Sequence, residues 1–232
     1  MRQPLAKRVV AEALGTFFLL AAVVGSGIMG ERLADGNTAL ALLANTAATG
    51  AALVALIISF GPMSGAHFNP VVTLSFACRG DLFWRDVPLY LLAQFVGGIG
   101  GVIAANVMFG LSPVFMSNHA RAGMAQLISE FIATLGLVSV ILATSRSTVA
   151  VVAVAVGAYI TATYWFTAST SFANPAVTVA RALSDTFAGI RPVDVPGFVL
   201  VQLAGGVAAT VLFRWLMPAQ NGDRNEQIPQ EN

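Results

Sequence analysis

Charged side chains are scarce in this chain. Only 10% of its 232 residues are Asp, Glu, Lys or Arg, whereas an average soluble domain has about a quarter. Hydrophobic residues make up 56%, and the mean hydropathy is +0.77. A soluble domain of this size cannot bury so much apolar surface, so the composition indicates a protein that resides in lipid. The net charge of +1 gives no support for nucleic-acid binding.

Cysteine and histidine are nearly absent as well. The single cysteine, Cys78, excludes an internal disulfide framework and a cysteine-rich metal site. A membrane-embedded enzyme needs a nucleophile with a base, or a metal cluster, facing a cavity. The two histidines do not supply either arrangement. We therefore expect no enzymatic activity, no metal and no cofactor.

Long apolar segments are what the chain has in abundance. Each of the six is close to the ~20 residues that a helix needs to cross a membrane: 9–30, 39–60, 87–109, 122–144, 148–168 and 195–217. The first follows basic residues, as a signal peptide does. It runs past the usual length, and no clear cleavage site follows, so we interpret it as a retained span. The expected protein is all-α, with one membrane domain (1–217) and a polar cytoplasmic tail (218–232).

Basic residues set the expected orientation. If both termini lie inside, eight basic residues are on the inner side and four on the outer side. The inner set is Arg2, Lys7, Arg8, Arg79, Arg85, Arg146, Arg214 and Arg224, and the outer set is Arg32, Arg121, Arg181 and Arg191. This moderate bias predicts cytoplasmic N- and C-termini.

Two apolar stretches, 61–78 and 169–183, are too short to cross. Each begins with small and turn-forming residues, then has Asn-Pro and about ten helix-compatible residues. Asn is a strong N-cap and Pro is favoured at the first helical position. Asn69 and Asn174 therefore each predict a loop that enters the membrane and continues as a half-helix. A pair of surface loops is the alternative, which the recurrence of the pattern in both halves disfavours.

An internal repeat supports this interpretation. The order Glu, Asn-Pro, Gln-x-x-Gly-Gly occurs twice, as Glu12, Asn69 and Gln94, and again as Glu130, Asn174 and Gln202. Each half (about 8–110 and 122–217) has three spans, so the halves lie in opposite orientations. The half-helices then meet N-terminus to N-terminus at the bilayer centre. Their positive dipole ends, with the asparagine NH2 groups facing a pore, would repel cations and protons.

Three ionisable residues near these loops each have two interpretations. Glu12 and Glu130 either form a proton relay or act as buried acceptors for backbone N–H groups of the loops. We favour acceptors, because both glutamates follow the repeat and no basic partner lies within a span. His67 is either a pH gate or a hydrogen-bonding support for the loop, and we favour the support.

These motifs resemble the major intrinsic proteins, the aquaporins and aquaglyceroporins. The resemblance covers residues 8–217 and includes SGAHFNP, the paired Asn-Pro motifs and the repeated glutamate. It implies six transmembrane helices plus two re-entrant half-helices, in a homotetramer with one pore per subunit in the bacterial inner membrane. The implied central constriction consists of Asn69, Pro70, Val71, Asn174, Pro175 and Ala176.

The resemblance also implies an outer filter, at positions counted from the two asparagines. The four positions hold Thr49, Ala162, Ser171 and Val177. The family typically has an arginine where this chain has Val177, so we expect a wide filter without a fixed positive charge, and the loss of that charge disfavours the passage of anions. Arg181 lies one helical turn farther out at the outer mouth. It either replaces the missing charge in part or reaches out to water, and we favour the second.

A wide filter would admit neutral solutes that are larger than water. Neutral polyols such as glycerol fit it, as do water and neutral metalloid hydroxides such as arsenous acid. The chain resembles bacterial members that are associated with arsenic resistance. The alternatives are a water-selective aquaporin, a proton-coupled transporter and a scaffold with a closed pore.

Overall fold

Residues 3–217 are described by the computed structural model, and the tail at 218–232 lies outside this range. Ten helical elements follow one another along these residues. They are α1 (Leu5–Leu33), α2 (Thr38–Ser64), α3 (Pro70–Arg79), η1 (Trp84–Asp86), α4 (Val87–Met108), α5 (Met124–Thr144), α6 (Val149–Phe166), α7 (Pro175–Arg181), η2 (Pro192–Asp194) and α8 (Val195–Leu216). Within them, six helices are long and apolar enough to cross a membrane, which confirms the predicted spans.

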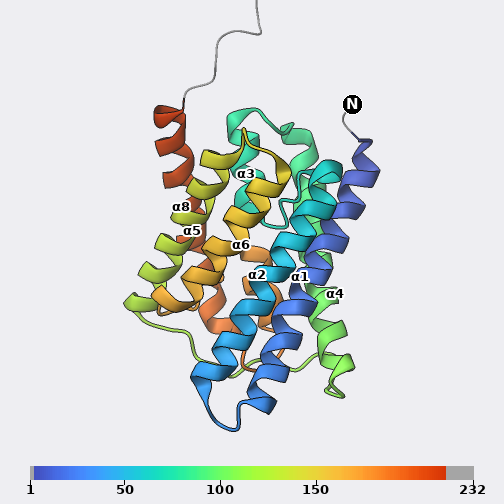
Figure 1. Ribbon diagram of the computed structural model, residues 1–232, viewed down its shortest axis with the longest axis vertical. Helices are drawn as coiled ribbons and strands as arrows, with labels where there is room; N and C mark the ends of the chain where they lie inside the picture. Colours follow the sequence, from blue (N-terminus) through green and yellow to red (C-terminus); the bar gives the residue numbers. More distant parts are fainter. Residues whose placement is uncertain (1–2, 218–232) are drawn as a thin grey trace, which may run out of the picture.

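The long helices form a bundle around the two short ones (Figure 1). α1 begins and α8 ends at the same end of this bundle, which we call the terminal face. The opposite end carries the connection 109–123, and we call it the loop face. In the first half α1 packs on α2 and α4, and in the second half α5 packs on α6 and α8. The packing thus repeats with the sequence, as the inverted-repeat prediction requires.

Both half-helices begin where the sequence predicts. Asn69 caps α3 and Asn174 caps α7, each in an extended backbone conformation and each followed by Pro at the start of the helix. α3 has 10 residues, close to the expected length, but α7 has only 7. α7 is shorter because the chain turns at Ala182 and pairs with the connection 109–123. Ser117 N donates to Ala182 O at 2.9 Å in that pairing.

The repeated glycine pairs hold the halves together. The first glycine of each pair faces a helix of its own half: a Cβ at Gly97 would meet Ala13 of α1, and one at Gly205 would meet Phe131 of α5. The second faces the half-helix of the other repeat, Gly98 lying against α7 and Gly206 against α3. Small residues let helices approach closely, so each pair packs one half-helix against the opposite repeat.

The two glycines of the first pair give a matched test of this packing. A methyl group at Gly97 would collide with the backbone oxygen of Ala13, whereas one at Gly98 would lie 3.5 Å from the Cβ of Ala180, an ordinary contact. We expect Gly97→Ala to destabilise the folded protein by about 1–3 kcal/mol. Gly98→Ala should leave it unchanged or slightly more stable, because alanine favours helices. Thermal unfolding in detergent measures both variants, and equal midpoints would contradict the packing.

Candidate functional site

Glu12 holds the first re-entrant loop. Its carboxylate accepts hydrogen bonds from the backbone N–H groups of His67 (2.9 Å) and Phe68 (2.7 Å), and from the Ser64 hydroxyl (2.6 Å). Phe68 has a φ of 49°, in the left-handed region that non-glycine residues rarely adopt. The carboxylate therefore stabilises a strained stretch of backbone by accepting the N–H groups that have no acceptor within a helix.

Glu130 repeats this arrangement in the second half. It accepts hydrogen bonds from the backbone N–H groups of Phe172 (2.8 Å) and Ala173 (2.9 Å), and from Nε2 of Gln202 (2.6 Å). Ala173 has a φ of 48°, matching that of Phe68. Both glutamates are fully buried, and these contacts are those of the acceptor interpretation.

The two asparagines cap their own helices and join the two loops. Oδ1 of Asn69 accepts from the N–H of Val71 at 3.0 Å, and Oδ1 of Asn174 accepts from the N–H of Ala176 at 2.9 Å. Nδ2 of Asn69 then donates to Ala173 O, and Nδ2 of Asn174 donates to Phe68 O, each at 2.8 Å.

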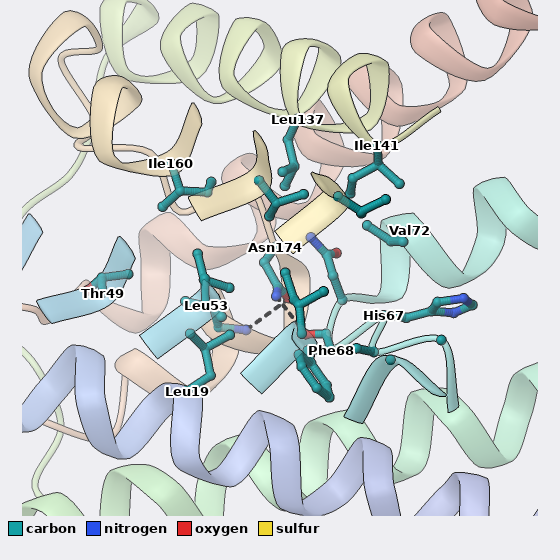
Figure 2. A pocket seen from close by; sticks show the side chains of 18 of the residues that line it. Leu19, Thr49, Leu53, His67, Phe68, Val72, Leu137, Ile141, Ile160 and Asn174 are labelled. Atoms are coloured by element: carbon teal, nitrogen blue, oxygen red, sulfur yellow. Dashed lines mark hydrogen bonds between the residues drawn. The ribbon is translucent and has the colours of Figure 1, made fainter. Parts of the chain in front are cut away.

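These cross-loop bonds modify the expected role of the amide groups. We expected each NH2 to face the pore, but one of its two N–H groups is used to join the loops. Both asparagines still line a cavity, so the other N–H is the one available to a solute. Figure 2 shows Asn174 and Phe68 close together among the lining residues.

One continuous cavity of about 230 Å³ passes the two asparagines. Gly61, Ser145 and Val149 line it toward the terminal face, and Tyr164 and Arg181 line it toward the loop face. Its walls between these ends are mostly apolar, with side chains from four long helices that include Leu19, Leu53, Ile57, Leu137, Ile141, Val152, Val156 and Ile160 (Figure 2).

Only two of the six predicted constriction residues line this cavity. These are Asn69 and Asn174, whereas Pro70, Val71, Pro175 and Ala176 are buried behind the cavity wall. Val71 packs against Val138, Leu142 and Ala209 between α5 and α8. Val71 therefore fills the protein interior and does not narrow the cavity.

Three of the four residues predicted for the outer filter line the cavity, and the fourth, Ala162, does not. Thr49, Ser171 and Val177 line the cavity. Ala162 is exposed, and Tyr164 lines the cavity in its place, with its OH donating to Thr49 Oγ1 at 3.3 Å. Two positions along a helix turn the side chain by about 200°, so Ala162 points away from the cavity.

Arg181 does not reach out to water. Its side chain is 2% exposed and lines the cavity. Its Nε donates to Ala188 O, and its Cζ lies 3.5 Å from the ring centroid of Phe172. The interfacial interpretation that we favoured is therefore wrong, because the stack on Phe172 and the bond to Ala188 keep the side chain inside. A fixed positive charge is present at this end of the cavity.

A second buried arginine, Arg121, was not singled out by the sequence. It is 7% exposed, and its guanidinium donates to the carbonyl oxygens of Gly189 (2.7 Å), Ser169 (3.1 Å) and Phe187 (3.3 Å). Burial and the charge of Arg181 lower the pKa of Arg121 to about 9, which leaves it charged at pH 7. The sequence does not predict the burial of Arg121, because this burial depends on how the connection 109–123 packs against residues 187–189.

His67 lies at the terminal-face approach to the asparagines. Its Nδ1 is 3.1 Å from Oγ1 of Thr73, and its ring packs 4.8 Å from that of Phe76. Thr73 Oγ1 also lies 3.1 Å from Asn69 O, the carbonyl at the N-cap of α3. The residue thus holds the start of α3, and it also borders a second cavity of about 580 Å³ at the terminal face.

The comparisons with known proteins agree with this geometry. The family model described as major intrinsic protein matches residues 1–149. The chain is 56% identical to aquaglyceroporin AqpS of Rhizobium meliloti (strain 1021), over 92% of this chain and 91% of that protein. It is 32% identical to aquaporin NIP1-4 of Oryza sativa subsp. japonica, over 94% of this chain and 78% of that one. The X-ray structure of the aquaglyceroporin from Plasmodium falciparum matches with a TM-score of 0.70 and 18% identity, over 92% and 95% of the two chains.

Six spanning helices, two half-helices and the cavity between them are the architecture of a multi-pass membrane channel. The chain belongs to the major intrinsic protein family, and it is therefore a channel for small solutes and not an enzyme.

The placement of Tyr164 and Ala162 can be tested with cysteine labelling. The only native cysteine is Cys78, so Cys78→Ser provides a thiol-free parent. In that background a small water-soluble thiol reagent should block most solute flux through Tyr164→Cys, because the new side chain lines the cavity. Ala162→Cys is the matched control on the same helix, and its flux should be insensitive to the reagent. Block at Ala162→Cys and not at Tyr164→Cys would restore the original filter assignment.

Proposed function

We propose that this chain is a passive channel for glycerol-like polyols, water and neutral metalloid hydroxides such as arsenous acid. The observation that carries the proposal is the continuous, mostly apolar cavity with Val177 and Ser171 in its wall near the loop face. These small side chains leave room for a solute larger than water beside Tyr164. The apolar wall suits the carbon backbone of a polyol, and the asparagine amides offer partners for its oxygens. Both relatives named as aquaglyceroporins are consistent with this substrate class.

The contacts of the two glutamates disfavour a proton-coupled transporter. Glu12 and Glu130 each accept hydrogen bonds from two backbone N–H groups. Both carboxylates are therefore occupied in holding the re-entrant loops. A water-selective pore remains the second candidate, favoured by the aromatic ring of Tyr164 and the charge of Arg181 at the loop-face end of the cavity.

The setting of the channel completes the proposal. We place the protein in the bacterial inner membrane as a homotetramer, with both termini in the cytoplasm. The two repeats, about 8–110 and 122–217, act as one channel domain within residues 1–217. The terminal face is then cytoplasmic and the loop face is the outer mouth.

Val177→Arg tests the width of the filter. A long guanidinium at this position extends into the cavity, so we expect it to suppress glycerol flux and arsenite uptake strongly and to spare water. Stopped-flow light scattering on proteoliposomes measures water and glycerol, and uptake on the same vesicles measures arsenite. Val177→Thr is the matched control of nearly equal volume and should keep all three fluxes. A wild-type protein that passes water alone would decide for the water-selective alternative.

Reporter fusions test the orientation. A fluorescent protein that folds only in the cytoplasm should be bright when fused after Asn232. Alkaline phosphatase, which is active only outside the cytoplasm, should be inactive there and active when fused after Ser112. The reverse pattern would invert the proposed topology without affecting the pore.

A further inference from the structure

Two buried guanidinium groups lie over one aromatic ring at the loop-face end of the cavity. The Cζ of Arg181 is 3.5 Å from the ring centroid of Phe172, and the Cζ of Arg121 is 4.9 Å from it. Neither arginine takes part in an ion pair with any residue between 3 and 217. Buried charges are normally paired, so this pair of unpaired cations needs an explanation.

The two arginines differ in how much of their donor capacity is used. All three nitrogens of the Arg121 guanidinium donate to backbone carbonyls, which makes this residue a clamp on the loops. Arg181 uses only Nε, which donates to Ala188 O. Within the described part of the chain both of its Nη groups lack a partner, and the side chain lines the cavity. These Nη groups are therefore available to a molecule inside the cavity.

A second polar group lacks a partner at the same place. Ser171 lines the cavity with Arg181, it is 3% exposed, and its Oγ makes no hydrogen bond to any described residue. A buried hydroxyl without a partner costs free energy. A ligand in the cavity can supply the bond that Ser171 lacks.

The charged groups around Phe172 have a net charge of +1. Glu130 contributes one negative charge next to the ring, through its hydrogen bond to Phe172 N at 2.8 Å. Arg191 and Asp194 pair with each other. Asp185 is exposed and binds the amides of Asn118. Two guanidinium groups and one carboxylate sum to a single positive charge.

We propose that Arg181 and Ser171 form a binding site for a small monovalent oxyanion at the loop-face end of the pore. The Nη groups of Arg181 match two oxygens of one anion, and the Ser171 hydroxyl donates to another. Arg121 adds charge without contact. The proposal rests on the proposed pore, because the bound anion occupies the path of a neutral solute and competes with it.

Methanesulfonate is a suitable probe, since it is a monovalent oxyanion at every pH of interest and does not cross lipid as a neutral acid. Glycerol flux into proteoliposomes is measured with methanesulfonate and with chloride at equal ionic strength. We expect methanesulfonate to slow the wild-type flux in a saturable manner and chloride to have little effect. In parallel, methanesulfonate should raise the thermal unfolding midpoint of the protein in detergent, which measures binding without any flux.

Variants assign the effect to the site. Arg181→Met keeps an unbranched side chain over Phe172 and should weaken methanesulfonate binding by roughly tenfold or more, as expected for the loss of a charge-assisted contact. Arg181→Lys keeps the charge without the fork and should weaken it less. Ser171→Ala should give an intermediate loss. Arg32→Met is the matched control, because Arg32 also stacks on a phenylalanine, Phe109, but is exposed at the loop face and does not line the cavity.

The outcomes separate the two proposals. Inhibition and stabilisation that persist unchanged in Arg181→Met and Ser171→Ala would overturn the site. No stabilisation of the wild type would overturn it as well, even if glycerol flux is normal. A wild type that passes no glycerol but is stabilised through Arg181 would keep the site and overturn the polyol channel. If Arg181→Met fails to fold, the Arg181→Lys and Ser171→Ala variants still decide.

Discussion

A backbone inside a bilayer has to find all of its hydrogen bonds within the protein, because the lipid offers none. The two re-entrant loops of this chain break that rule locally, since their left-handed residues cannot join a helix. Glu12 and Glu130 resolve the conflict by accepting the N–H groups that the loops leave open. Each carboxyl group has two oxygens, so it accepts two consecutive N–H groups at once. The position of both asparagines, and with it the whole middle of the pore, depends on these two contacts.

The two repeats are also joined to each other by hydrogen bonds and by close packing. Each asparagine caps its own half-helix and donates to the loop of the other repeat. The second glycine of each pair packs against the half-helix of the opposite repeat in the same crossed sense. The cross-links are reciprocal, so a shift of one loop displaces the carbonyl that holds the other.

The sequence predicted the features that depend on neighbours along the chain. Span length and the Asn-Pro caps are local signals, and the repeat showed that Glu12 and Glu130 have matching roles. The prediction failed where distance along the chain is a poor guide to space. Ala162 was placed by counting back from Asn174 across the loop 167–173, whose left-handed residues change the register between α6 and α7. The burial of Arg181 and Arg121 depends on contacts with 187–189 in the following loop, which no spacing rule describes.

Val177 and Arg181 lie one turn apart on α7 and line the same cavity. A valine at the first position leaves space beside the tyrosine of α6, because its branched side chain is short and apolar. The arginine one turn later keeps a positive charge on the same cavity, held back from the centre by Phe172 and Ala188. In a mostly apolar channel the field of a charge extends well beyond its contact distance, since little polar material screens it. The chain therefore keeps a positive charge on the cavity although position 177 holds no guanidinium.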